Sequence, residues 1–211
     1  MAGPVTQFAV DELWRVLDDV DPVDVLSGEL CSTPLSAFPA EVSRAVRAAA
    51  FAVLAGRVML VPGAVTVGVI GSGLAAELSV SVIARHLPDV VHVAVHKGHL
   101  GARVQDQLDL DGIDVAVPGE ISDAVFGASF VVVTDALATG LPRRLAKGAV
   151  LVNTSGVDVP TQVDQVYAAA DLRQVLAGTR PGRRRIDDVV LVEDRFDAVL
   201  ADYSSARRKS G

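Results

Sequence analysis

A short run of small residues offers the clearest chemistry in this sequence. Gly71, Gly73 and Ala76 have the spacing G-x-G-x-x-A, directly after the apolar run VTVGVI at residues 65–70. Glycine permits a tight turn and a close backbone approach, and alanine lets a following helix pack on the strand. The N-terminus of that helix carries unpaired N–H groups and a partial positive charge, which suit the pyrophosphate of a dinucleotide. The alternative is a tight turn in another doubly wound fold.

The tip of the next apolar run, residues 91–96, indicates which dinucleotide the loop would prefer. An acidic side chain at this point accepts hydrogen bonds from the ribose 2′-hydroxyl of NAD and repels a 2′-phosphate. Here the tip reads His96-Lys97, and His99 and Arg103 follow. Positive side chains pair with phosphate, so the pattern predicts NADP as the cofactor, ahead of NAD. The alternative is a polar loop that recognises no 2′ group.

The elements that would position these residues alternate along the middle of the chain. We expect strands near 65–70, 91–96, 113–117, 129–134 and 149–153, and helices near 74–87, 99–108, 119–126 and 141–147. This alternation predicts an α/β fold: a Rossmann-type, doubly wound parallel sheet.

Both ends of the chain are expected to be mainly helical. We expect helices at 8–19 and 39–60 with a connector at 21–38, a helix from Pro160 to about 177, a strand at 188–192 and a last helix. The sequence therefore predicts a dinucleotide-binding domain at 64–155. A reduced helical region for dimerisation and substrate would come from residues 1–63 and 156–211.

Composition narrows the classes of function. The 211 residues carry a net charge of −7, which argues against a nucleic-acid partner despite the basic runs at 183–185 and 207–209. No apolar run is long enough to span a membrane and the N-terminus lacks a basic signal-peptide region, so we expect no membrane partner. The single cysteine, Cys31, cannot form an internal disulfide, which predicts a cytoplasmic protein. We expect Cys31 to be a small packed residue and not a nucleophile, and we expect no metal site.

Four stretches recur in the order typical of one known family. They are AVRAAAFAVLAGRVM, VGVIGSGLAAE, LVNTSGVDVP and DLRQVLAGTRPGRRRIDDVVLVED. With the opening DELWRVLDDVDPVDVL, they resemble the ornithine cyclodeaminase/μ-crystallin family. The resemblance implies a Rossmann domain and a second domain, built from both chain ends, that dimerises and holds the substrate. It also implies hydride transfer between NAD(P) and an imine or amino acid. Family members are much longer, so the substrate domain would be reduced here.

The resemblance assigns two catalytic candidates. Arg47 matches the family arginine that binds the substrate carboxylate, a role that suits a guanidinium. The alternative is a solvated arginine on an Ala-rich helix. Asp158 matches the family acid beside the substrate amine, which helps to activate water or take up a proton. The alternative is a cap for a helix that begins near Pro160.

The candidate cofactor-binding residues lie in the glycine loop and at the ends of later strands. They are Gly71, Ser72, Gly73, Leu74, Ala75, His96, Lys97, Thr134 and Ser155. Several family positions differ, however. Ala48 and Ala136 replace threonines, Ala75 replaces a glutamine, Ser129 replaces an aspartate, and VEDRF replaces a glycine-containing loop near the nicotinamide.

Two hypotheses about function follow. In the first, the protein is an NAD(P)-dependent oxidoreductase with an imine or amino acid as substrate. In the second, it is a reduced homologue without redox chemistry. Such a protein would bind a ligand or partner, or would catalyse a non-redox step in the pocket that serves the oxidoreductases of the family. A homodimer is expected in either case, because the helix at 39–60 and the last helix would leave an apolar face uncovered.

Overall fold

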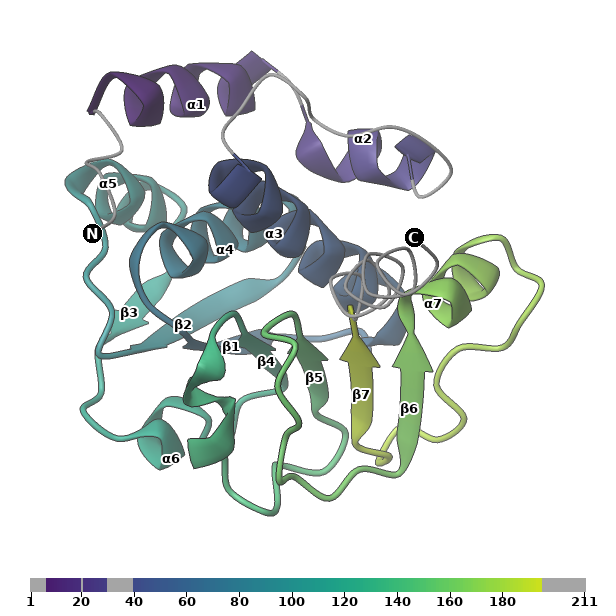
Figure 1. The fold of residues 1–211 in the computed structure, drawn as a ribbon. Coiled ribbons are helices and arrows are strands. Elements are labelled where there is room, and N and C mark those ends of the chain that lie inside the picture. Colours follow the sequence, from purple (N-terminus) through teal and green to yellow (C-terminus); the bar gives the residue numbers. More distant parts are fainter. Residues whose placement is uncertain (1–6, 20, 30–39, 195–211) are drawn as a thin grey trace, which may run out of the picture.

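A seven-stranded sheet forms the centre of the protein (Figure 1). The computed structural model describes residues 7–19, 21–29 and 40–194. Every strand pairs in parallel with its neighbours, in the order β3-β2-β1-β4-β5-β7-β6. The strands are β1 (Val65–Ile70), β2 (Val90–His96), β3 (Asp114–Ala116), β4 (Phe130–Val133), β5 (Val150–Asn153), β6 (Gln165–Ala168) and β7 (Val190–Glu193). The predicted Rossmann-type parallel sheet is therefore confirmed.

Helices cover the two faces of the sheet unequally. They are α1 (Gln7–Asp19), α2 (Pro22–Glu29), α3 (Ala40–Met59), α4 (Gly73–His86), α5 (Ala102–Leu110), α6 (Ile121–Ala124), α7 (Ala169–Leu176) and the 3₁₀ helix η1 (Ala136–Gly140). Figure 1 shows α1 to α5 on one side of the sheet and α6 on the other. The core on the α6 side is completed by Leu141, Leu145, Val159 and Val163, which belong to loops.

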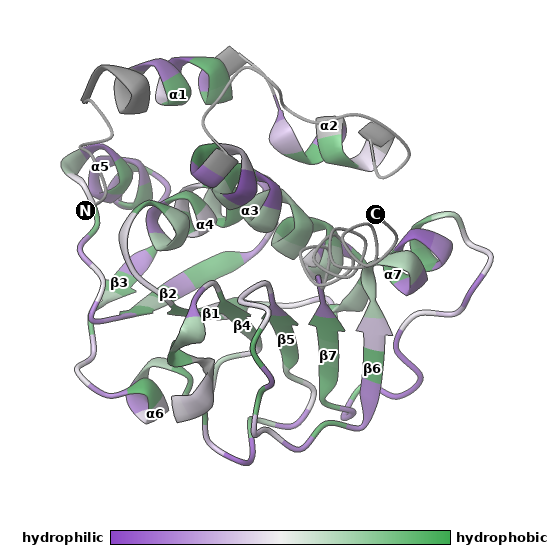
Figure 2. Cartoon of the chain, viewed as in Figure 1, coloured by the Kyte–Doolittle hydropathy of each residue, from purple (hydrophilic) through white to green (hydrophobic). Residues whose placement is uncertain are grey.

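Apolar residues on both faces explain why the central strands lie inside. All four residues of β4 and of β5 are buried, as expected for parallel strands with both faces covered. Figure 2 shows these strands as hydrophobic, whereas the edge strand β6 is mixed. In β6, buried and exposed residues alternate.

Helix α3 is buried within a single chain. Ala49, Phe51 and Ala52 have no exposed surface, and Ala50 has 1%. Its small alanines allow close packing against α4 and α2. The argument for a dimer from an uncovered face on this helix is therefore wrong, and the homodimer stays a prediction without that support.

Three expected elements differ from the structure. The connector at 21–38 contains α2, because Asp21 accepts a hydrogen bond from the N–H of Val23 at 2.7 Å and starts the helix. Residues 141–147 form no helix: the carbonyl of Arg143 accepts from the N–H of Gln162 at 2.8 Å. The helix expected after Pro160 begins only at Ala169, and residues 165–168 form β6 instead.

The division of the chain into domains stays a prediction, although β6 and β7 extend the sheet beyond residue 155. The last helix, the run at 207–209 and Cys31 lie outside the described residues.

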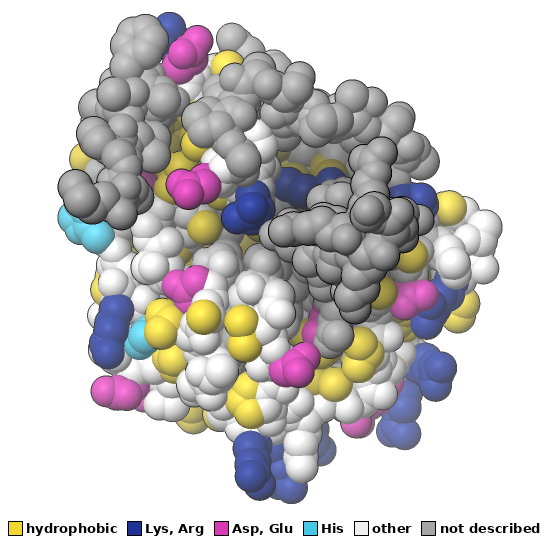
Figure 3. Space-filling model, in the orientation of Figure 1, with side chains coloured by type: hydrophobic (Ala, Val, Ile, Leu, Met, Phe, Trp, Pro, Cys, Tyr) yellow, Lys and Arg dark blue, Asp and Glu magenta, His cyan; other side chains and the backbone are white. Residues whose placement is uncertain are grey.

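On the face seen in Figure 3, basic and acidic side chains are interspersed. Within the described ranges, no helix combines the length and hydrophobicity needed to cross a membrane.

Candidate functional site

The glycine loop lies at the carboxyl end of β1, at the point where the direction of winding reverses. From β1 the chain adds β2 and β3 on one side and β4 and β5 on the other. Ligands of open α/β sheets bind in the crevice at this point, outside the carboxyl ends of the strands. The structure therefore places the G-x-G-x-x-A motif where a nucleotide site is expected.

Gly71 is required by the strand next to it. A Cβ atom on Gly71 would collide with Oγ1 of Thr134, the residue that follows β4. The N–H of Thr134 donates to the carbonyl of Ile70 at 2.9 Å, which fixes this close approach. Oγ1 of Thr134 is itself buried and has no hydrogen-bond partner in the described part of the chain. A buried polar atom without a partner in the described residues is consistent with a ligand-binding turn.

The first turn of α4 is available to an anion. Ser72 precedes the helix in an extended conformation, and its side chain makes no capping hydrogen bond. Gly73 has φ +60°, and a Cβ atom there would meet nothing within 4 Å. Ala76 is 2% exposed and packs in the core, with Leu74 and Ala75 half-buried beside it. These features fit a pyrophosphate at the N–H groups of α4.

The tip of β2 presents one exposed cation. Lys97 is exposed, and its backbone has φ 49° while its N–H donates to the carbonyl of Pro118 at 3.1 Å. His96 is only 4% exposed, and its Nε2 atom lies 3.2 Å from the carbonyl oxygen of Gly119. Of the two, Lys97 is the side chain that is open to solvent at this tip.

The turn after β5 is ordered by its own side chains. Ser155 donates from its hydroxyl to Oδ1 of Asn153 at 2.6 Å, and that hydroxyl accepts from the N–H of Val157 at 3.2 Å. Nδ2 of Asn153 donates to the carbonyl of Val157 at 2.8 Å. Ser155 therefore lies at the same edge of the sheet as the glycine loop, with its hydroxyl engaged in the turn.

The two catalytic candidates differ in their surroundings. Nε of Arg47 lies 3.5 Å from Oδ2 of Asp194, the residue after β7. The side chains of Arg47 and Asp194 are 30% and 9% exposed. Asp158 is exposed on the segment after β5. No helix follows Asp158 before Ala169, so the alternative reading of this acid as a helix cap is wrong.

Two acids at this edge were not among the sequence candidates. Asp135 follows Thr134 after β4, and Oδ2 of Asp135 accepts a hydrogen bond from the Ser72 hydroxyl at 3.2 Å. Asp194, described above, follows β7. Their position directly after buried parallel strands was the signal that could have identified them. In the described part of the chain, no group of three or more His, Cys, Asp or Glu could hold a metal ion.

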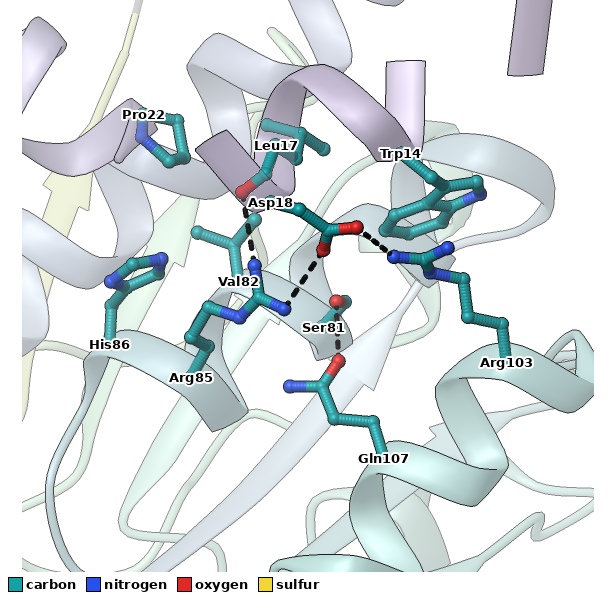
Figure 4. A pocket seen from close by; sticks show the side chains of 10 residues that line it. All are labelled: Trp14, Leu17, Asp18, Pro22, Ser81, Val82, Arg85, His86, Arg103 and Gln107. Atoms are coloured by element: carbon teal, nitrogen blue, oxygen red, sulfur yellow. Dashed lines mark hydrogen bonds and ion pairs between the residues drawn. The ribbon is translucent and has the colours of Figure 1, made fainter. Parts of the chain in front are cut away.

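A separate crevice lies between α1, α4 and α5 (Figure 4). Asp18 there accepts hydrogen bonds from Arg103 at 2.6 Å and from Arg85 at 3.2 Å. These bonds, first that of Arg103 and then that of Arg85, hold the pKa of Asp18 below its usual range. Burial lowers the pKa of His86 in the same crevice. Arg85 is about 18 Å along α4 from Gly73, so this crevice is distinct from the glycine loop. Its ion pairs hold α1 against α4 and α5.

The crevice changes the reading of one basic residue. Besides its bond to Asp18, the Arg103 guanidinium lies 5.6 Å from the ring centroid of Trp14. Both of these contacts of the Arg103 side chain are with residues of α1. The expectation that Arg103 neutralises a 2′-phosphate is therefore withdrawn, and only Lys97 and the exposed His99 remain near that tip.

We expect Gly71→Ala to lower the free energy of unfolding by about 2 kcal/mol, because the new methyl group overpacks against Thr134. The double variant Gly71→Ala/Thr134→Ala should recover most of the loss, since it removes the colliding hydroxyl. Thr134→Ala alone is the control and should change stability little, because Oγ1 has no partner in the described structure. Urea unfolding checks all three variants. An equal loss in the single and double variants would contradict the assigned contact.

Several solved structures share the fold of this chain. The chain superposes on Thermococcus litoralis Δ1-pyrroline-2-carboxylate reductase, solved with NADH and L-proline, with TM-score 0.55 and 13% identity over 73% of this chain and 59% of the reductase. A Bordetella pertussis protein described as "probable ornithine cyclodeaminase" gives TM-score 0.54 and 16% identity over 72% and 60%. CmnK gives 0.58 and 21% over 85% and 67%. The chain has the fold of these proteins.

This likeness agrees with the resemblance read from the sequence: the fold is shared with proteins of the ornithine cyclodeaminase type. The chain spans about 60% of the length of the reductase and the cyclodeaminase. No protein-family model and no curated protein matches the sequence.

Proposed function

We propose that the chain binds a nicotinamide dinucleotide at the Gly71–Ala76 loop and acts as an oxidoreductase on an imine or amino acid. The observation that carries the proposal is the loop itself. Three features meet at the switch point of the parallel sheet: a helix N-terminus without a side-chain cap, an open Gly73, and a buried Thr134 hydroxyl for which the described residues provide no hydrogen-bond partner. The solved NADH complex of a protein with this fold supports the choice of ligand.

In this proposal the residues of the chain have separate roles. The N–H groups of α4 bind the pyrophosphate, and Gly73 leaves room for it. The bound nicotinamide would supply the site that accepts or gives a hydride. Arg47 orients the carboxylate of the substrate by charge-assisted hydrogen bonds, and Asp158 holds or takes up a proton at the substrate nitrogen.

The second candidate, a homologue without redox chemistry, is favoured by one contact. Because Arg47 is already paired with Asp194, a substrate carboxylate has to share or displace a resident acid. A site of this kind would bind its substrate weakly or would have lost it. We also keep a homodimer and a cytoplasmic location as predictions.

A titration with reduced nucleotides tests the proposal. Purified protein should enhance nicotinamide fluorescence and bind NADPH more tightly than NADH, because the exposed Lys97 directly follows β2, where a 2′-phosphate would bind, and residues 96–99 contain no acid. Lys97 is exposed, so its contact should give about a 5- to 10-fold preference. Lys97→Glu should remove the preference by weakening NADPH alone, and added salt should reduce it.

The control is Lys147→Glu, which changes the same charge at the amino end of β5, at the opposite edge of the sheet from the loop. This variant should keep the wild-type preference. Failure of the wild type to bind either nucleotide at millimolar concentration would overturn the dinucleotide proposal. Equal binding of NADH and NADPH would overturn only the choice of NADP.

A further inference from the structure

An acidic side chain occupies the edge of the proposed phosphate site. Asp135 is half-buried in the loop after β4, next to Thr134, and two hydrogen bonds fix its carboxylate. Oδ1 accepts from the N–H of Leu137 at 2.8 Å, and Oδ2 accepts from the hydroxyl of Ser72 at 3.2 Å. Ser72 is the middle residue of Gly71-Ser72-Gly73, so the Asp135 carboxylate forms a hydrogen bond with the glycine loop itself.

Among the described residues, no cation forms an ion pair with the Asp135 carboxylate. In the part of the chain that the structure describes, this acid has no ion pair, and its two partners are a hydroxyl and a backbone N–H. Arg47, at the same edge of the sheet, pairs with Asp194 instead. This carboxylate can therefore act on an anion that binds at the loop.

Helix α4 has no side-chain cap, and the Ser72 hydroxyl contacts Asp135. A serine at this position normally accepts a hydrogen bond from an N–H of the first turn. Here its hydroxyl is directed to Asp135, and no capping bond forms. The carboxylate thus lies as a resident anion near the positive end of the helix dipole, which is the feature that also attracts phosphate.

We propose that Asp135 limits the affinity of the loop for dinucleotides by charge repulsion with the pyrophosphate. The inference rests on the proposed function, because it takes the pyrophosphate to bind at α4. Two like charges a few ångströms apart near a protein surface repel strongly. Asp135 therefore weakens NADH and NADPH by the same factor, since both carry the same pyrophosphate. Lys97, in contrast, discriminates between them.

The test is Asp135→Asn, which removes the charge but keeps an oxygen acceptor for the N–H of Leu137. Fluorescence titration at low salt should show about 10-fold tighter binding of both NADH and NADPH. The gain should shrink at 0.5 M salt, where exposed charges are screened within a few ångströms. An urea-unfolding curve close to that of the wild type shows that the turn at Leu137 is preserved.

The matched control is Asp114→Asn, which removes the same charge from an exposed acid at the start of β3, at the opposite edge of the sheet. It should leave both affinities within about 2-fold of the wild type, as expected for a screened distant charge. If the wild type binds dinucleotide and Asp135→Asn leaves the affinity unchanged or weakens it, this inference is overturned. The proposed dinucleotide site would then be retained. Absence of binding in both the wild type and Asp135→Asn overturns the proposed function, and this inference with it.

Discussion

Replacing Gly73 by alanine is expected to abolish dinucleotide binding and leave the fold intact. The backbone of Gly73 has φ +60°, and a Cβ atom built there meets nothing within 4 Å. The methyl group would therefore fill the open space in front of the first turn of α4, where the pyrophosphate must approach the backbone. We expect a loss of affinity of more than about 100-fold for both NADH and NADPH, or about 3 kcal/mol.

The fold should tolerate the exchange at a modest cost. An alanine in the left-handed region costs about 1–2 kcal/mol, and no neighbouring atom obstructs the side chain. Gly112→Ala is a matched control, because Gly112 has φ +68° and an equally open Cβ position, in the turn between α5 and β3. The two variants should lose similar free energies of unfolding, but only Gly73→Ala should lose nucleotide binding. Unchanged binding in Gly73→Ala would show that the ligand does not approach this turn.

The sequence predicted the part of the fold where local signals agree. The run VTVGVI, the glycine loop and the amphipathic segment after it became β1, the turn and α4, with bounds within one residue of those expected. Here β-branched residues, glycine spacing and helical periodicity all indicate the same structure. The expected strands at 113–117, 129–134 and 149–153 were found for the same reason.

In two of the three misassigned segments, a distant partner determines the conformation. Gln165–Ala168 forms a strand because it pairs with β7, more than twenty residues later. Four residues are too few for a reliable alternation, and the helix at Ala169 follows at once. Residues 141–147 form no helix, because the carbonyls of Arg143 and Pro142 accept hydrogen bonds from Gln162 and Thr161. Neither pairing has a local signal.

The candidate site shows the same division. The backbone features of the loop could be read from Gly71, Gly73 and Ala76. Asp135 and Asp194 could have been placed at this edge from their positions after buried strands. Their contacts with Ser72 and Arg47 could not, because these residues come together only after the sheet has formed. The family pattern has a different residue type near these positions, so resemblance did not suggest them either.

Replacing Arg47 by methionine is expected to lower the free energy of unfolding by about 3 kcal/mol. Methionine retains an unbranched apolar chain but removes the guanidinium, which lies 3.5 Å from the largely buried carboxylate of Asp194. Arg57→Met is the control on the same helix, since the Arg57 guanidinium donates to the carbonyl of His86 and meets no acid in that contact. This exchange should cost about 1 kcal/mol. Urea unfolding of the two variants measures the difference, and equal losses would contradict the importance of the ion pair.

The double variant Arg47→Met/Asp194→Asn separates pairing from packing. If the loss in Arg47→Met comes from leaving a buried carboxylate without its cation, an asparagine at position 194 should recover more than half of it, because no charge remains to be buried. Absence of recovery would show that Arg47 stabilises the protein through its other contacts. Recovery would mean that Asp194 holds Arg47 in the free protein. Under the proposed function, a substrate carboxylate would then have to compete with Asp194 for the same guanidinium, so this acid, and not Arg47 alone, would limit how tightly a substrate binds.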